Sequence, residues 1–134
     1  MKTKTTLITG GSSGIGAAIA KGLLAKNETV ITLGLEIPNW KHKNLYGYKA
    51  DLTNEKLTKE AADLISSEHK INSIVHNAGM ILPNLLQKVE TNDVLSLSQL
   101  HLAAPITLTQ AILPNMIKDK NGRIVFISSR ASMG

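Results

Sequence analysis

The fold is decided by the stretch Thr9-Gly10-Gly11-Ser12-Ser13-Gly14-Ile15-Gly16. It follows residues 5–9, a short β-branched and apolar run that predicts a buried strand. It opens residues 14–26, where Ile15, Ile19 and Leu23 recur at the spacing of one helical face. The stretch is therefore a glycine-rich turn between a first strand and a first helix.

The chemistry of this turn lies in its backbone. Gly10 permits a tight turn, Gly14 has no Cβ and lets a pyrophosphate approach, and Gly16 allows close packing of helix and strand. The start of the helix offers unpaired N–H groups and the positive end of its dipole to phosphates. A glycine-rich turn alone is a weak signal, and a turn without a ligand is the alternative. Its position at the end of the first strand favours a phosphate site.

Outward from the turn, strands and helical segments alternate. Further strands are predicted at residues 29–33, 45–50, 71–76 and 123–128, and helices at residues 54–68 and 93–118. Thr53 is the expected cap of the first of these helices. Pro105 and Pro114 lie inside the second, so a kink, a break or two shorter helices are all compatible with the sequence. The alternation predicts an α/β fold with a parallel sheet and right-handed crossovers.

Composition bounds the class of protein. The chain has 134 residues, with 43% hydrophobic and 19% charged residues, a balance that excludes intrinsic disorder. No apolar run approaches the roughly 18 residues of a membrane span, so no membrane partner is expected. The absence of cysteine excludes disulfides and thiol chemistry, and fits a cytoplasmic location.

The net charge of +5 allows an anionic partner, but the lysines are scattered and aromatic residues make up only 3%. We therefore expect a solvated lysine surface and no nucleic-acid partner. His76 is the residue to consider as a metal ligand. No histidine or carboxylate lies at ligand spacing from it, so a packing role at a strand end is favoured and no metal is expected.

Thr9 followed by Gly-x-x-x-Gly-x-Gly resembles the short-chain dehydrogenase/reductase family, and further segments match that family in order. These are Asp51-Leu52, where the family contacts adenine; His76-Asn77-Ala78-Gly79, similar to its Asn-Asn-Ala-Gly; residues 101–116, similar to its central helix; and residues 122–129, similar to its fifth strand and the serine after it. The resemblance implies a Rossmann-like, doubly wound parallel sheet of about five strands in the order 3-2-1-4-5.

The resemblance also implies a nicotinamide cofactor, NAD or NADP. The positions that match the family's cofactor site are Thr9, Gly10, Ser12, Ser13, Gly14, Ile15, Gly16, Gly34, Leu35, Asp51, Leu52, Asn77, Ala78 and Gly79.

The choice between NAD and NADP stays open. An NAD site needs a carboxylate at the end of the second strand for the ribose 2′-hydroxyl, and an NADP site needs a cation for the 2′-phosphate. Gly34 stands where NAD users carry Asp, and Leu35 where many NADP users carry Arg. Glu36 is a candidate for the ribose, and Lys41 or Lys43 for a phosphate. Solvated loop charges are an equally good interpretation of all three.

The catalytic set implied by the resemblance is incomplete. Ser129 matches the family's serine, with Ser128 as the weaker alternative. His101 stands at the position of the catalytic asparagine, either replacing its proton relay or tolerated as a substitution. The family's Tyr-x-x-x-Lys is expected roughly a dozen residues after the serine, beyond Gly134. Tyr46 and Tyr48 have no lysine four residues on.

Three functional interpretations follow. The first is an NAD(P)-dependent oxidoreductase that transfers hydride between nicotinamide and an alcohol or ketone, with little turnover by these 134 residues alone. The second is a non-catalytic nucleotide-binding or oligomerisation module, and the third is a truncated product without activity.

Residues 1–134 are interpreted as an incomplete NAD(P)-binding Rossmann domain, cut on its C-terminal side, since such domains run to roughly 200–250 residues. The resemblance implies a homo-oligomer, a dimer or tetramer. Apolar surface should be exposed where later elements pack. Trp40 either covers the adenine edge or is an aromatic residue of a surface loop.

Overall fold

A computed structural model describes residues 3–130, which form a five-stranded parallel sheet in the order β3-β2-β1-β4-β5. The strands are β1 (Thr5–Thr9), β2 (Thr29–Gly34), β3 (Leu45–Lys49), β4 (Ser73–His76) and β5 (Arg123–Phe126). β1 pairs in parallel with both β2 and β4, so the chain reverses its winding direction beside β1. The α/β class and the strand order predicted from the sequence are confirmed.

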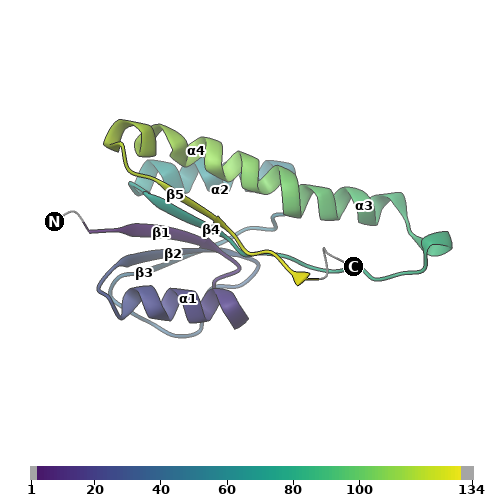
Figure 1. The fold of residues 1–134 in the computed structure, drawn as a ribbon, viewed down its shortest axis with the longest axis horizontal. Coiled ribbons are helices and arrows are strands. Elements are labelled where there is room, and N and C mark those ends of the chain that lie inside the picture. The colour runs from purple at the N-terminus through teal and green to yellow at the C-terminus, as the bar shows by residue number, and fades with distance from the viewer. Residues whose placement is uncertain (1–2, 131–134) are drawn as a thin grey trace.

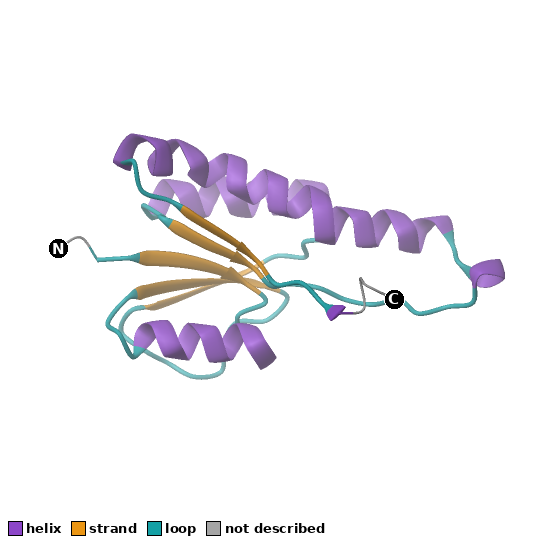
Figure 2. Ribbon diagram, in the orientation of Figure 1, coloured by secondary structure: helices purple, strands orange, loops and turns teal. Residues whose placement is uncertain are grey.

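Helices cover both faces of the sheet (Figures 1 and 2). α1 (Gly14–Leu24) lies on one face, and α2 (Glu55–Glu68) and α4 (Ala104–Asp119) lie side by side on the other. α3 (Thr91–Ser98) continues the line of α4 beyond the sheet, joined to it by the π-helical turn η2 (Gln99–Ala103). A short 3-10 turn, η1 (Leu86–Lys88), precedes α3. This is the doubly wound arrangement expected.

Each face of the sheet carries its own core, because successive side chains of a strand point to opposite faces. Leu7 is buried under α2 and α4, and its neighbour Ile8 is buried under α1. A parallel sheet covered on both sides buries its central strands on both faces, and in β1 and β2 every residue after the first is buried, threonines included. Thr32, in the middle of β2, is 1% exposed and its hydroxyl has no partner within residues 3–130.

Several predicted boundaries are wrong in detail. Asn54, not Thr53, caps α2, and its side-chain oxygen accepts from the N–H of Leu57 at 2.9 Å. Over residues 93–118, where the sequence allowed a kink, a break or two shorter helices, the structure has two helices joined by the π-helical turn Gln99–Ala103, which precedes both prolines. Pro105 directly follows this turn, in the first turn of α4. The last strand ends at Phe126 rather than at residue 128.

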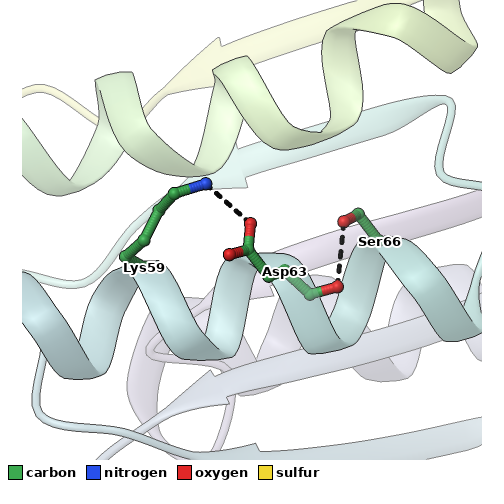
Figure 3. A network of polar contacts seen from close by, with 3 residues as sticks. All are labelled: Lys59, Asp63 and Ser66. Carbon is green, nitrogen blue, oxygen red and sulfur yellow. Dashed lines mark hydrogen bonds and ion pairs between the residues drawn. The ribbon is translucent and has the colours of Figure 1, made fainter.

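The exposed face of α2 is held by local polar contacts (Figure 3). Lys59 Nζ lies 2.7 Å from Asp63 Oδ1, and the hydroxyl of Ser66 donates to the backbone carbonyl of Asp63 at 3.1 Å. Such a pair at a spacing of four residues contributes about 0.2–0.5 kcal/mol to the helix. None of the helices within residues 3–130 is long and apolar enough to cross a membrane.

β5 forms an apolar edge of the sheet in the described structure. Ile124, Val125 and Phe126 are 43%, 36% and 61% exposed, in contrast to the fully buried strands at the centre. On α4, beside β5, Ile106 is 58% exposed. The apolar flank predicted from the sequence is therefore exposed at this edge.

Candidate functional site

The turn between β1 and α1 adopts the backbone conformation that its glycines allow. Gly10 and Gly14 have φ values of +66° and +54°, in the left-handed region that side chains disfavour. The N–H of Gly10 donates to the carbonyl of Leu33 at 2.9 Å, which ties the turn to the end of β2. The turn is thus fixed to the sheet on its β2 side.

On its other side the turn packs against Asn77 with no space to spare. A Cβ at Gly16 would lie 2.2 Å from the carbonyl oxygen of Gly10 and 2.5 Å from Nδ2 of Asn77. The same Nδ2 donates to the carbonyls of Thr9 and Gly10 at 3.1 and 3.2 Å. Gly16 is therefore required by this close approach, and Asn77 closes the turn from the side of β4.

Thr9 joins the ends of β1 and β4. Its hydroxyl oxygen accepts from the N–H groups of Asn77 and Ala78, at 3.0 and 2.9 Å. Thr9 is only 3% exposed, so these two bonds form away from bulk water. They place Asn77, Ala78 and Gly79 opposite the glycine turn, with the two segments forming facing walls.

The N-terminus of α1 is free to meet a ligand. Ser13 is the N-cap residue in extended conformation, its side chain makes no capping hydrogen bond, and the first turn of α1 holds no acidic residue. The first N–H groups of a helix have no intrahelical partner, and they carry the positive end of the dipole. The backbone and charge of α1 are thus arranged to receive an anion.

A cleft of about 360 Å³ lies between these walls. Its volume is in the range of small-molecule and cofactor sites. It is lined by Gly10, Ser12, Ser13, Gly34, Leu35, Glu36, Ala50, Asp51, Leu52, Thr53, Asn77, Ala78, Gly79, Met80 and Leu100. The ends of four strands, β1 to β4, and the start of α1 contribute to this surface, which is the place where open α/β sheets bind ligands.

Most of the residues predicted for a cofactor site line this cleft. Thr9 instead lines a smaller adjoining cavity, and Gly14, Ile15 and Gly16 form the first turn of α1 rather than the cleft wall. Ile15 points outward and is 62% exposed.

Sequence reasoning missed four residues of the cleft wall. Ala50 directly precedes Asp51 and Met80 directly follows Gly79, so their places beside predicted site segments are a usable signal. The sequence predicts Thr53 as a helix cap and gives no sign of its place in the cleft wall. Leu100 reaches the cleft from the π-helical turn, and no pattern in the sequence predicts that turn.

Asp51 is held in a fixed orientation at the cleft. Its Oδ1 accepts from the N–H of Thr53 at 2.9 Å and from the Thr53 hydroxyl at 2.6 Å. This local turn follows β3 and presents the carboxylate beside Leu52. Asp51 and Glu36 are the charged residues of the cleft wall, so the wall is acidic.

His101 lies in the π-helical turn and covers Gly79. Its Nε2 lies 3.0 Å from the carbonyl oxygen and 3.4 Å from the N–H nitrogen of Met80. The shorter distance favours a proton on Nε2 that is donated to the carbonyl. A Cβ at Gly79 would lie 2.9 Å from Cε1 of His101, so the loop after β4 needs a glycine beneath the ring.

His76 is a second histidine near the cleft, and it is buried. Its Nε2 lies 3.0 Å from the Thr109 hydroxyl, and its ring stacks on Phe126 with centroids 4.7 Å apart. Nδ1 is buried without a partner within residues 3–130. Burial lowers the pKa of His76 to about 4, so the ring is neutral at pH 7. His76 and His101 line the same cavity of about 60 Å³, which adjoins the cleft.

Ser128 and Ser129 follow β5 and are exposed. The carboxyl ends of parallel strands share one edge of the sheet, so both serines lie toward the edge that carries the cleft. Neither is among the described residues that line the cleft or the small cavity. No group of three or more metal-ligating side chains occurs in the described part of the chain.

The sheet is doubly wound, and the cleft lies beside β1, where the winding direction reverses. Together with the glycine turn and the free N-terminus of α1, this arrangement defines a Rossmann-type nucleotide-binding protein. The sequence model of the short chain dehydrogenase family matches residues 4–134. The chain belongs to this family, as its motifs indicated.

Individual relatives agree with the family assignment. An uncharacterized oxidoreductase from Bacillus subtilis, YmfI, is 34% identical over 136 residues, which cover 94% of this chain and 56% of the relative. A metagenomic short-chain oxidoreductase solved with NADP has a TM-score of 0.86 at 27% identity, covering 96% of this chain and 62% of that one.

A short-chain dehydrogenase from Leptospira borgpetersenii, solved with bound NAD+, shares the fold. It has a TM-score of 0.86 at 23% identity, covering 99% of this chain and 54% of that one. The chain therefore spans little more than half the length of the proteins that it matches.

Proposed function

We propose that residues 1–134 are the NAD(P)-binding part of a short-chain dehydrogenase/reductase domain, whose whole reaction transfers hydride between nicotinamide and an alcohol or ketone. The observation that carries this proposal is the uncapped N-terminus of α1, which opens at Ser12 and Ser13 into the cleft. The residues present fit a dinucleotide, because this end of the helix suits a pyrophosphate and the cleft extends to Asp51 for the adenine.

In this proposal the two walls of the cleft contact different parts of the dinucleotide. The N–H groups of the glycine turn and of the first turn of α1 bind the phosphates, and Asp51 with Leu52 borders the adenine. Asn77, Ala78 and Gly79 hold the opposite wall in place through Thr9. When bound, the dinucleotide supplies or takes up the hydride.

On the reactive side, Ser129 is the proposed hydrogen-bond partner of the substrate oxygen. His101 replaces the family's asparagine in the central helix. Its ring is held by Met80 at the cleft and so is positioned to carry a proton relay. His101→Asn, the family's own residue, should keep cofactor binding intact and change only the turnover of a complete enzyme.

We further propose that these residues alone turn over little substrate. The tyrosines lie on β3, away from the cleft wall, and Tyr48 donates its hydroxyl proton to Glu68 while lying 2.8 Å from Nε2 of His69. Loss of a general acid–base group typically costs about 10²–10⁴-fold in rate. Rapid reduction of any ketone by the chain would refute this.

A charge introduced at Ser13 tests the nucleotide site without disturbing the fold. Ser13→Asp should weaken NADH and NADPH binding at least about tenfold through repulsion of the phosphates, while it stabilises α1 as an N-cap. Ser13→Asn is the matched control, because it caps equally well without the charge. Calorimetric titration measures binding, and thermal unfolding measures stability. Binding unchanged by Ser13→Asp, or absent from the unmodified chain, would refute the proposal.

The exposed edge of β5 supports the alternative of a non-catalytic nucleotide-binding or oligomerisation module. An unpaired apolar strand is a template for pairing with another chain. We propose a cytoplasmic homo-oligomer, a dimer or tetramer. Sedimentation should show a defined dimer or tetramer that Phe126→Lys dissociates. If the chain neither binds nucleotide nor assembles, the third interpretation, a truncated product without activity, is the one that remains.

A further inference from the structure

The connection between β2 and β3 is the one crossover of the described sheet that carries no helix. α1 follows β1, α2 follows β3, and α3 with α4 follows β4, whereas residues 35–44 join β2 to β3 as a loop. Parallel strands usually need a dozen or more residues and a helix for such a connection. Among residues 3–130, α1 is therefore the only helix on its face of the sheet, and it lies over β1 and β2 rather than over the edge strand β3 (Figure 1).

The loop covers only part of this bare side. Trp40 packs against the core beneath α1, and Nζ of Lys21 lies 5.1 Å from its ring centroid, so Trp40 does not cover the adenine edge. Ile37 lies over Gly47 of β3, where a Cβ would come within 2.7 Å of Cγ2 of Ile37. Between loop and strand a groove of about 320 Å³ stays open, lined by Ile37, Pro38, Trp40, Lys41, His42, Leu45 and Gly47.

The outer edge of β3 carries unpaired backbone groups. The carbonyl of Asn44 accepts from β2 and the N–H of Ala50 donates to β2, both at 2.9 Å. Since alternate residues of a strand direct their backbone groups to the same side, those of Gly47 and Lys49 point away from β2. Neither residue has a hydrogen bond to any other segment of residues 3–130. An edge of this kind is a template for a further strand.

A strand added beside β3 would find contacts for its side chains on both faces. Side chains alternate along β3, so Leu45 and Gly47 face the groove, and Tyr46 and Tyr48 face the side of α2. Tyr46 is 46% exposed and packs edge-on against His69, with ring centroids 4.9 Å apart. The edge thus offers an apolar groove on one face and a supported aromatic ring on the other, which suits cross-strand pairing.

The charge at both ends of this edge is positive. Lys41 and Lys43 precede β3 and Lys49 ends it; all three are exposed, and none forms an ion pair within residues 3–130. No carboxylate occurs between residues 41 and 49, and Glu68, which accepts from Tyr48, lies on the α2 side. Two copies of the edge would bring their lysines together, and like charges across strands destabilise a pair. The edge therefore suits an acidic strand rather than a second copy.

We propose that the outer edge of β3 binds an acidic, extended peptide segment of a partner protein by strand addition. The backbone of the segment pairs with Gly47 and Lys49, and one of its apolar side chains enters the groove beside Ile37. Its carboxylates meet the three lysines. None of these lysines lines the nucleotide cleft, so the inference does not depend on the proposed function.

A short capped peptide with a central run of valines flanked by glutamates is the probe. When it saturates the chain, amide hydrogen exchange at Gly47 and Lys49 should slow at least about tenfold, because both N–H groups become hydrogen-bonded. Lys49→Glu should weaken the affinity at least about tenfold, because repulsion replaces attraction. Lys88→Glu is the matched control. It makes the same charge change in η1, away from β3, and should leave the affinity unchanged.

Two control peptides separate charge from strand pairing. The same valines flanked by lysines should not bind, and the glutamate peptide with N-methylated valines should bind at least about tenfold more weakly, because the methyl groups block backbone pairing. The inference is overturned if the glutamate peptide does not bind, if either control binds equally well, or if Lys49→Glu has no effect. Tighter binding of a single-stranded DNA oligonucleotide of the same net charge would also overturn it. Titration with NADH is a separate measurement, and its failure would refute the proposed function while leaving the peptide result intact.

Discussion

Among the glycines of the described chain, Gly16 is the one where an added Cβ would meet the nearest atom, so Gly16→Ala is expected to be strongly destabilising. The new Cβ would lie 2.2 Å from the carbonyl oxygen of Gly10 and 2.5 Å from Nδ2 of Asn77. Backbone cannot rotate away as a long side chain does, so the glycine turn must retreat by roughly 1 Å to reach contact distance. That movement opposes the 2.9 Å bond from Gly10 to Leu33 and the 3.2 Å bond from Asn77 to Gly10.

The loss in free energy of unfolding of Gly16→Ala follows from these contacts. Overpacking typically costs about 1–3 kcal/mol, and each weakened hydrogen bond adds about 1 kcal/mol. The better helix propensity of alanine offsets up to about 1 kcal/mol of this destabilisation. The free energy of unfolding should fall by about 3 kcal/mol, which lowers Tm by roughly 10 °C for a chain of this length. Cofactor affinity should fall as well, because the turn and Asn77 move together.

Gly22→Ala provides the matched control on the same helix. A Cβ at Gly22 meets nothing within 4 Å, so the only effect is helix propensity. This variant should be more stable by about 0.5–1 kcal/mol and should bind cofactor normally. Urea unfolding followed by circular dichroism measures both variants. If Gly16→Ala proves as stable as Gly22→Ala and binds cofactor equally well, the close approach of turn and Asn77 is not what holds the site.

Three further changes probe the polar contacts. Thr9→Val keeps the shape but leaves two N–H groups at the end of β4 unpaired, so the free energy of unfolding should fall by about 2–4 kcal/mol in urea. Burial and Glu68 raise the pKa of Tyr48 to about 12, above its unfolded value of 10.0, so stability should fall as pH rises from 10 to 12, and Tyr48→Phe should remove that dependence. Burial lowers the pKa of His76 from 6.5 to about 4, so the folded chain should lose stability as pH falls through this window, and His76→Asn should abolish the loss.

Each of these has a clear contrary result. Thr9→Val with unchanged unfolding would mean that water replaces the hydroxyl. A Tyr48→Phe variant that still loses stability between pH 10 and 12 would assign that loss to another group. Acid unfolding that is identical in His76→Asn and the unmodified chain would show that the buried ring does not control it.

The sequence determined the fold because its signals are local and repeated. The run over residues 5–9, the glycine turn and the helical spacing of residues 14–26 each require one conformation, and they agree with one another. Alternation of such units predicts a parallel sheet with right-handed crossovers, and the resemblance to the short-chain dehydrogenase/reductase family implied the order of its strands. Asn77, Ala78 and Gly79 were predicted as site residues because they resemble the family's Asn-Asn-Ala-Gly motif.

The tertiary structure alone decided how these segments meet. Only the folded chain brings Gly16 against Asn77, because their contact depends on the pairing of β1 with β4. Only the path of the loop after β2, fixed by the packing of Trp40 beneath α1, separates Lys41 from the cleft that Glu36 lines. The π-helical turn that carries His101 also left no pattern in the sequence, because one extra residue in a helix is set by packing rather than by propensity. Local periodicity thus fixed the elements, and long-range packing fixed the charge and shape of the cleft between them.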